Sequence, residues 1–179
     1  SALMVCVFAA GCGQQEEAEG DVQGSETGSY RIGIIQYNEH VALDSAREGF
    51  LEALADNGYV EGENLEVDFQ NAQGDQSNLS TISKSFVSQD MDLVLGIATP
   101  AVQSIAGETE EIPIVGTAVT DYVVAKLAES DEEPGYNVTG TSDMNPIEEQ
   151  IELLTQLCPD AKTVGVLYTN SEDNSVLQA

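Results

Sequence analysis

Small polar side chains follow several short apolar runs of the sequence. They are amides, hydroxyls and two carboxylates: Gln36, Asn38, Thr99, Thr117, Thr120, Asp121, Thr141, Ser142 and Asp143. Such groups donate and accept hydrogen bonds, yet the set offers no obvious nucleophile with a general base beside it. The residue types therefore predict that this part of the chain recognises a small polar molecule and carries out no reaction on it.

The sequence also lacks the short motifs of common catalytic and phosphate-binding sites. It contains no G-x-G-x-x-G or G-x-x-x-x-G-K-[ST] turn, no G-x-S-x-G turn and no H-E-x-x-H pair. The only histidine is His40, and the cysteines at 6, 12 and 158 form no CxxC or Cys/His cluster. We therefore expect no enzyme activity, no metal ion, no cofactor and no disulfide.

Thr99 is the most specific of the polar candidates. The stretch "TPAVQSIA" predicts a helix over 99–106, with Thr99 as its N-cap and Pro100 at its first position. The free backbone N–H groups at such a helix start, together with a hydroxyl, can bind a carboxylate or another small anion. Alternatively, Thr99 only caps its own helix. The sequence leaves both alternatives open.

The remaining candidates each have an ordinary structural alternative. Asp121 can accept a hydrogen bond from a ligand ammonium group, although aspartate after a strand is common as a turn residue. Asp143, ahead of Asn145 and Pro146, has the same two interpretations. His40 either faces the same site or caps the helix that follows it. Cys158 ends a helical pattern, where a half-buried thiol is the usual structure.

The elements that must position these residues alternate between strand and helix. Apolar runs predict strands over 30–37, 64–70, 92–97, 112–116 and 136–143, and helical spacing predicts helices over 41–57, around 79–86, over 99–106 and over 147–158. Strict alternation in 64–70 places that strand near a sheet edge. This order predicts an α/β fold with a doubly wound parallel sheet flanked by helices, in which ligands bind beyond the carboxyl ends of the strands.

Composition limits the classes of partner. The chain has 179 residues, is 41% apolar and carries 32 acidic against 5 basic side chains, for a net charge of −27. This apolar content is enough for a packed core. The charge would repel a phosphate backbone and an anionic lipid surface, so we expect no nucleic acid as a partner.

The N-terminus predicts an anchor. Residues 2–10 are apolar and end in Ala9-Ala10-Gly11-Cys12, which resembles the lipobox of bacterial lipoproteins, whose cysteine is joined to diacylglycerol. The resemblance implies a signal-peptide remnant over 1–12 and lipidation of Cys12. An ordinary secretory signal or a buried apolar strand is the alternative. Residues 13–29 are polar and acidic, and predict a tether that spans roughly 20–25 Å.

Five segments together resemble a known family. They are "GFLEALADNGYVEGENLEVDFQNAQGD", "GIATPAVQSIA", "PIVGTAVTD", "NVTGTSD" and "AKTVGVLYTNSEDNS". They resemble the ABC-transporter substrate-binding proteins of the group with tryptophan- and tyrosine-binding members, which have a type I periplasmic-binding fold. The resemblance implies a small-molecule ligand between two lobes, and an ABC permease with its ATPase as partners. It implies ligand contacts at Gln36, His40, Ala98, Thr99, Ala101, Thr117, Ala118 and Thr120, and it places Asp121 and Asp143 in matching motifs.

The same resemblance divides the chain. It implies a first ligand-binding lobe over 30–160, and a hinge with the truncated start of a second lobe over 161–179, where we expect a strand and the beginning of a helix. The resulting hypothesis is an extracytoplasmic, lipid-anchored solute receptor of an ABC importer, with an amino acid as the favoured ligand. A ligand-sensing domain of a signalling protein and an enzyme on the same sheet are the alternatives.

Overall fold

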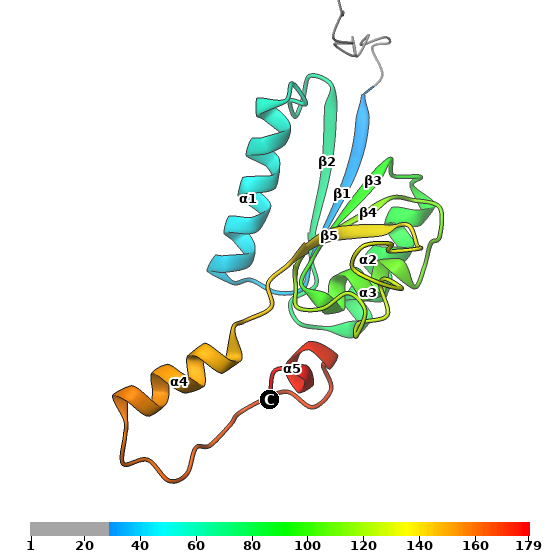
Figure 1. Ribbon diagram of the computed structural model, residues 1–179. Coiled ribbons are helices and arrows are strands. Elements are labelled where there is room, and N and C mark those ends of the chain that lie inside the picture. The colour runs from blue at the N-terminus through cyan, green and yellow to red at the C-terminus, as the bar shows by residue number, and fades with distance from the viewer. Residues whose placement is uncertain (1–28) are drawn as a thin grey trace, which may run out of the picture.

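The computed structural model describes residues 29–179, which contain ten helices and strands (Figure 1). In chain order they are β1 (Tyr30–Gln36), α1 (Val41–Asp56), β2 (Leu65–Asn71), α2 (Gln76–Ser88), β3 (Leu93–Ile97), α3 (Thr99–Ala106), β4 (Ile114–Val119), β5 (Val138–Ser142), α4 (Ile147–Leu157) and α5 (Asp173–Leu177). The predicted signal remnant, the anchor at Cys12 and all but the last residue of the tether lie outside the described residues. Within 29–179, no helix combines the length and apolar character needed to cross a membrane.

The five strands form one parallel sheet. Their order is β2-β1-β3-β4-β5, and every neighbouring pair runs in the same direction. Figure 1 shows α1 on one face of the sheet and α2 with α3 on the other. This arrangement confirms the predicted doubly wound α/β fold, and β2 lies at a sheet edge as its alternating sequence predicted.

Apolar side chains build a core on each face of the sheet. Ile32 and Ile34 of β1 point to the face where Phe50 and Leu54 of α1 cover them. Ile35 directly follows Ile34 and faces the other side of the sheet, where it belongs to the larger cluster formed with α2 and α3. The two clusters hold the strands rigidly between layers of helix, which fixes the positions of the strand ends.

Glycines in four strands make room for the α2–α3 layer. Gly33 lies beneath Phe86, Gly96 beneath Val102, and both Gly116 and Gly140 beneath Tyr122. A Cβ on Gly96 would lie 2.7 Å from a Val102 methyl group and 3.1 Å from the Val102 Cα. Because backbone as well as side chain blocks that space, α3 can approach β3 this closely only over a glycine.

Strand β4 is longer than the sequence predicted. It runs over Ile114–Val119 instead of ending at Gly116, so Thr117 and Ala118 lie within the strand. The pairing between β4 and β5 shifts register between Gly116 and Val119. Ala118 has a φ of 53°, which allows this bulge.

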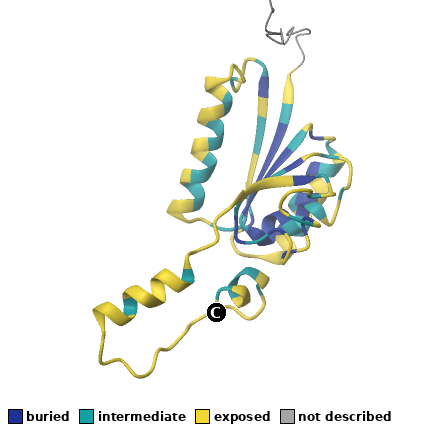
Figure 2. Ribbon diagram, viewed as in Figure 1, coloured by how far each residue is buried: buried dark blue, intermediate teal, exposed yellow. Residues whose placement is uncertain are grey.

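The last third of the chain departs most from expectation. Helix α4 forms where it was predicted but buries no residue, and Leu157 is 71% exposed (Figure 2). Cys158 is exposed, so its prediction as a half-buried thiol is wrong. Residues 161–168 form no strand, because no other described strand lies beside them to share hydrogen bonds, whereas α5 forms within the predicted helical start.

Candidate ligand-binding site

The connections of the sheet define a crevice at its carboxyl edge. The chain leaves β1 for α1 on one face and leaves β3 for α3 on the opposite face, and β1 pairs with β3. In open α/β sheets this change of side leaves a gap between the two connections, where ligands bind. Gln36 ends β1 and Thr99 follows β3, so both predicted residues flank that gap.

Thr99 holds a buried hydroxyl that forms no hydrogen bond to any described residue. The N-cap of α3 is Ala98 and makes no side-chain cap, while Thr99 is the first helical residue. The prediction of Thr99 as N-cap is therefore wrong by one position. Its side chain is 2% exposed, and its Oγ1 has no hydrogen-bond partner among residues 29–179. A buried hydroxyl without a partner is costly, and a ligand group would satisfy it.

Two alanines beside Thr99 and Thr117 have strained backbones. Ala98 has φ 81° and ψ 149°, a conformation that is essentially restricted to glycine. Ala118 also has a positive φ. The two neighbouring strands are joined there by the Ala98 N–H, which donates to the Thr117 carbonyl at 3.0 Å. Strain of this kind is concentrated at ligand sites, and it coincides here with the predicted residues.

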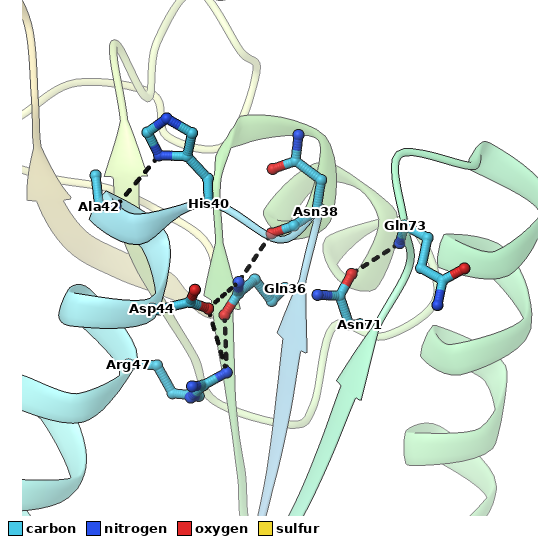
Figure 3. Close-up of polar contacts among 8 residues, drawn as sticks. All are labelled: Gln36, Asn38, His40, Ala42, Asp44, Arg47, Asn71 and Gln73. Atoms are coloured by element: carbon cyan, nitrogen blue, oxygen red, sulfur yellow. Dashed lines mark hydrogen bonds and ion pairs between the residues drawn. The ribbon is translucent and has the colours of Figure 1, made fainter.

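Gln36 is buried, and both polar atoms of its amide have partners within the chain (Figure 3). Nε2 donates to the Asn38 carbonyl at 2.8 Å and to Asp44 Oδ1 at 2.9 Å, and Oε1 accepts from Arg47 at 3.3 Å. These bonds tie the end of β1 to the first turns of α1. Gln36 thus fixes the loop at the crevice, and its ligand contact stays a prediction.

His40 caps α1, which was the alternative to a ligand role. Its Nδ1 accepts from the Ala42 N–H at 3.2 Å, and the ring is exposed beside the same loop (Figure 3). A hollow of about 650 Å³ opens there, lined by Asn38, Glu39, Asp44, Arg47, Phe69, Asn71 and Gln73. The Arg47 guanidinium lies 4.2 Å from the centre of the Phe69 ring and forms part of this lining.

Hydroxyl groups link the ends of β4 and β5. Thr141 Oγ1 donates to Thr117 Oγ1 at 3.2 Å, and Ser142 Oγ donates to the Thr120 carbonyl at 2.7 Å. Thr120 is 4% exposed, and its own hydroxyl accepts from Gln178 Nε2 at 3.1 Å. The structure therefore brings Thr117 and Thr120 together with Thr141 and Ser142 in one polar edge.

The remaining predicted site residues are Asp121, Asp143 and Ala101. Asp121 accepts from the Val124 N–H at 2.8 Å, so it forms the turn after β4, as its alternative interpretation had it. Asp143 is exposed, and its backbone N–H donates to the Val119 carbonyl. Ala101 is fully buried in the hydrophobic core, and its ligand contact stays a prediction.

The C-terminal residues 172–178, here called the cap segment, lie against the strand ends (Figure 1). Tyr37 Oη donates to Glu172 at 3.5 Å, and Gln103 Nε2 donates to Asp173 Oδ2 at 3.4 Å. Burial, followed by the Glu172 charge and this hydrogen bond, raises the pKa of Tyr37. These contacts join β1 and α3 to a segment more than sixty residues away in sequence.

Asn174 in the cap segment was not among the predicted site residues. Its Oδ1 is buried and, like Thr99 Oγ1, has no partner among the described residues. The signal was present in the motif "TNSEDNS", but nothing in its spacing singles out the one residue whose oxygen the fold leaves without a donor. Burial and orientation of a single amide depend on tertiary packing, so only the structure identifies it.

Known proteins resemble the chain over most of its described length. The family model of ABC transporter substrate binding proteins matches residues 31–179. Tyrosine-binding protein of Clostridioides difficile is 45% identical over 171 residues, which cover 94% of this chain and 50% of that protein. Substrate-binding proteins of ABC transporters bind molecules and are not enzymes, which confirms the prediction of no enzyme activity.

Two solved structures are similar in fold and sequence. A Streptococcus pneumoniae ABC domain in complex with L-Trp is 44% identical, has a TM-score of 0.81, and aligns over 84% of this chain and 50% of its own. A ligand-free, open substrate-binding protein from Clostridium difficile is 47% identical with a TM-score of 0.70, over 83% of this chain and 50% of its own. The chain thus spans about half the length of these relatives. By sequence and by structure, it belongs to the ABC transporter substrate-binding protein family.

Proposed function

We propose that residues 30–160 form the first lobe, and 161–179 the start of the second lobe, of an extracytoplasmic receptor for an ABC importer. The receptor closes on one amino acid at the carboxyl edge of the sheet and delivers it to the permease. Support comes from the family, whose members work outside the cytoplasm, and from the polar edge at β3, β4 and β5.

The observation that carries the proposal is the pair of buried, unpartnered atoms, Thr99 Oγ1 and Asn174 Oδ1. Gln103 lies one helical turn beyond Thr99, and its bond to Asp173 holds α3 beside α5. Polar atoms left without partners on both sides of this contact are a cost to the protein alone. A bound ligand that donates a hydrogen bond to Asn174 Oδ1 and forms a second hydrogen bond with Thr99 Oγ1 would remove that cost.

The chemistry of the edge favours an amino acid. Hydroxyls and the start of α3 suit an α-carboxylate, and the exposed Asp143 and the half-buried Glu172 supply negative charge for an ammonium group. The relatives named for L-tyrosine and crystallised with L-Trp favour an aromatic side chain. We infer that an aromatic amino acid is the ligand of this chain as well.

Calorimetry of a chain extended through a complete second lobe tests the proposal. L-Tyrosine or L-tryptophan is expected to bind with one site per protein, while L-lysine serves as a control of unlike chemistry. The chain of 179 residues should bind at least about tenfold more weakly, because half of the preorganised clamp is missing. Absence of binding to both aromatic amino acids, or equal affinity of the two chains, would contradict the proposal.

We further propose that Cys12 carries two acyl chains and that residues 13–29 tether the receptor to the membrane. Burial of about 0.8 kcal/mol per methylene makes two chains a lasting anchor where one chain is marginal. Replacement Cys12→Ala should move the protein from the membrane fraction to the soluble fraction, and Cys6→Ala should leave it in place. Equal distribution of both variants would exclude this anchor.

A further inference from the structure

Four side-chain hydrogen bonds join the cap segment to residues 37–145. The pairs are Tyr37 to Glu172, Gln103 to Asp173, Gln178 to Thr120 and Asn145 to Gln178. The first two are long, at 3.5 and 3.4 Å between the heavy atoms. Gln178 takes part in the other two, and its bond to Thr120 is 3.1 Å long, so this residue makes two of the four attachments.

Gln178 connects three separate parts of the fold through one amide. Its Nε2 donates to the hydroxyl of Thr120, a buried residue directly after β4. Its Oε1 accepts from Asn145, which lies in the crossing between β5 and α4. Both polar atoms of Gln178 therefore have a protein partner, so this one side chain links the cap segment to β4 and to the crossing before α4.

Two relatives give a comparison for the position of the cap segment. The TM-score is 0.81 to the complex with L-Trp and 0.70 to the ligand-free, open relative. The two comparisons cover almost the same share of this chain and differ little in identity. The arrangement of the described residues is thus more similar to that of the ligand-bound relative.

We propose that Gln178 is a positioning residue that holds the cap segment over the strand ends and so favours the closed receptor before a ligand arrives. This inference rests on the proposed function. When only a fraction of a receptor is competent to bind, its apparent dissociation constant rises in inverse proportion to that fraction. A residue that raises the closed population therefore tightens binding and slows release without touching the ligand.

Three substitutions in the protein with both lobes test the role of Gln178. Gln178→Ala removes both bonds. Gln178→Glu keeps both, because the Thr120 hydroxyl can donate to one carboxylate oxygen and Asn145 to the other. Gln150→Ala is the matched control, since Gln150 is an exposed glutamine on α4 whose side chain makes no hydrogen bond to the described residues.

Two measurements give the readout. The first is the dissociation rate of L-tyrosine or L-tryptophan by stopped-flow. The second is the distance between spin labels on Val176→Cys, an exposed position of the cap segment, and on Ser45→Cys, an exposed position of α1, in ligand-free protein with Cys6→Ser, Cys12→Ser and Cys158→Ser. One label lies on the cap segment and the other on the first lobe, so their distance reports whether the cap segment is closed.

We expect Gln178→Ala to release ligand about fivefold to twenty-fivefold faster, because each of the two lost bonds is worth a factor of up to about five. Its ligand-free label distances should broaden toward open states, and Gln178→Glu should restore both readouts. Rates and distances equal to those of Gln150→Ala would overturn the inference and leave the proposed function standing. If the unaltered protein bound neither amino acid, the proposed function would fail, and the ligand-free distances alone would decide the role of Gln178.

Discussion

Thr99 and Gln36 are both buried at the ends of neighbouring strands, yet their polar atoms have opposite surroundings. Gln36 satisfies its amide with Asn38, Asp44 and Arg47, so it stabilises the loop between β1 and α1. Thr99 has no partner for its hydroxyl within 29–179, at a cost of about 1–3 kcal/mol. The strained Ala98 beside it adds a cost of about the same size. Costs of this kind are typical of ligand sites, and they occur together at the end of β3.

The free energy of unfolding should depend on pH through the side chain of Tyr122. Burial raises the pKa of Tyr122 to about 12, and the Asp143 charge adds to that shift. An unfolded tyrosine loses its proton near pH 10, whereas the folded one keeps it to about pH 12. The unfolding free energy contributed by this group is therefore complete below pH 10. It falls by about 1.4 kcal/mol per pH unit as the pH rises from 10 to 12.

Urea unfolding across pH 9–12 measures this effect. The variant Tyr122→Phe should show a shallower loss of unfolding free energy above pH 10 than the unaltered chain. Tyr136→Phe is the matched control, because Tyr136 is 57% exposed and should keep the full slope. Identical slopes for the two variants would show that Tyr122 is not protected by the fold.

At the scale of elements, the strands and the helices that pack on them position the site residues. The packing of α3 on β3 has the strictest steric requirement. Thr99 can lie at the strand ends only because α3 approaches β3 over Gly96. Phe86 over Gly33 places α2 in the same way against β1. The geometry of the site therefore depends on two glycines that are themselves buried in the sheet.

Gly96→Ala is predicted to displace α3. The added Cβ would meet the Val102 backbone as well as its side chain, so the helix must shift, at a cost of about 1–3 kcal/mol in unfolding free energy. Ligand affinity should fall in parallel, since Thr99 moves with α3. In Gly49→Ala the new Cβ meets nothing within 4 Å, and this control on α1 should be neutral or more stable by about 0.5–1 kcal/mol. Urea unfolding and calorimetry measure both effects, and equal stability of the two variants would contradict the prediction.

The pattern of apolar residues in the sequence predicted most of the helices and strands, but it misplaced the end of β4 and the N-cap of α3. Apolar periodicity placed α1, β2 and β3 to within a residue or two, because it reflects which face of each element is buried. The end of β4 was missed, since a bulge at Ala118 continues the strand through Thr117. The N-cap of α3 was misplaced because the residue there is an alanine, which has no capping side chain.

At the scale of the whole molecule, the cap segment brings the last residues of the chain to the strand ends. Contacts between Gln178 and Thr120, or between Glu172 and Tyr37, span 58 and 135 residues. No local pattern predicts such pairs, so the sequence indicated the crevice but not Asn174 or Gln178. The exposed apolar side chains of α4, such as Leu157, likewise depend on what packs against them and not on their own spacing. The family resemblance supplied the two-lobed plan that the described residues alone do not contain.

The replacement Thr99→Val tests the central claim most directly, because it changes a hydroxyl for a methyl group in a buried position. Ligand-free protein should be unaltered or more stable by about 1 kcal/mol, since the lost hydroxyl has no partner. Affinity of the two-lobed protein for L-tyrosine or L-tryptophan should fall by at least about tenfold. Thr81→Val, which alters an exposed hydroxyl bonded to the Ser77 carbonyl, should leave that affinity unchanged. Unchanged affinity in Thr99→Val would contradict the account, because the unpaired hydroxyl would then serve no ligand.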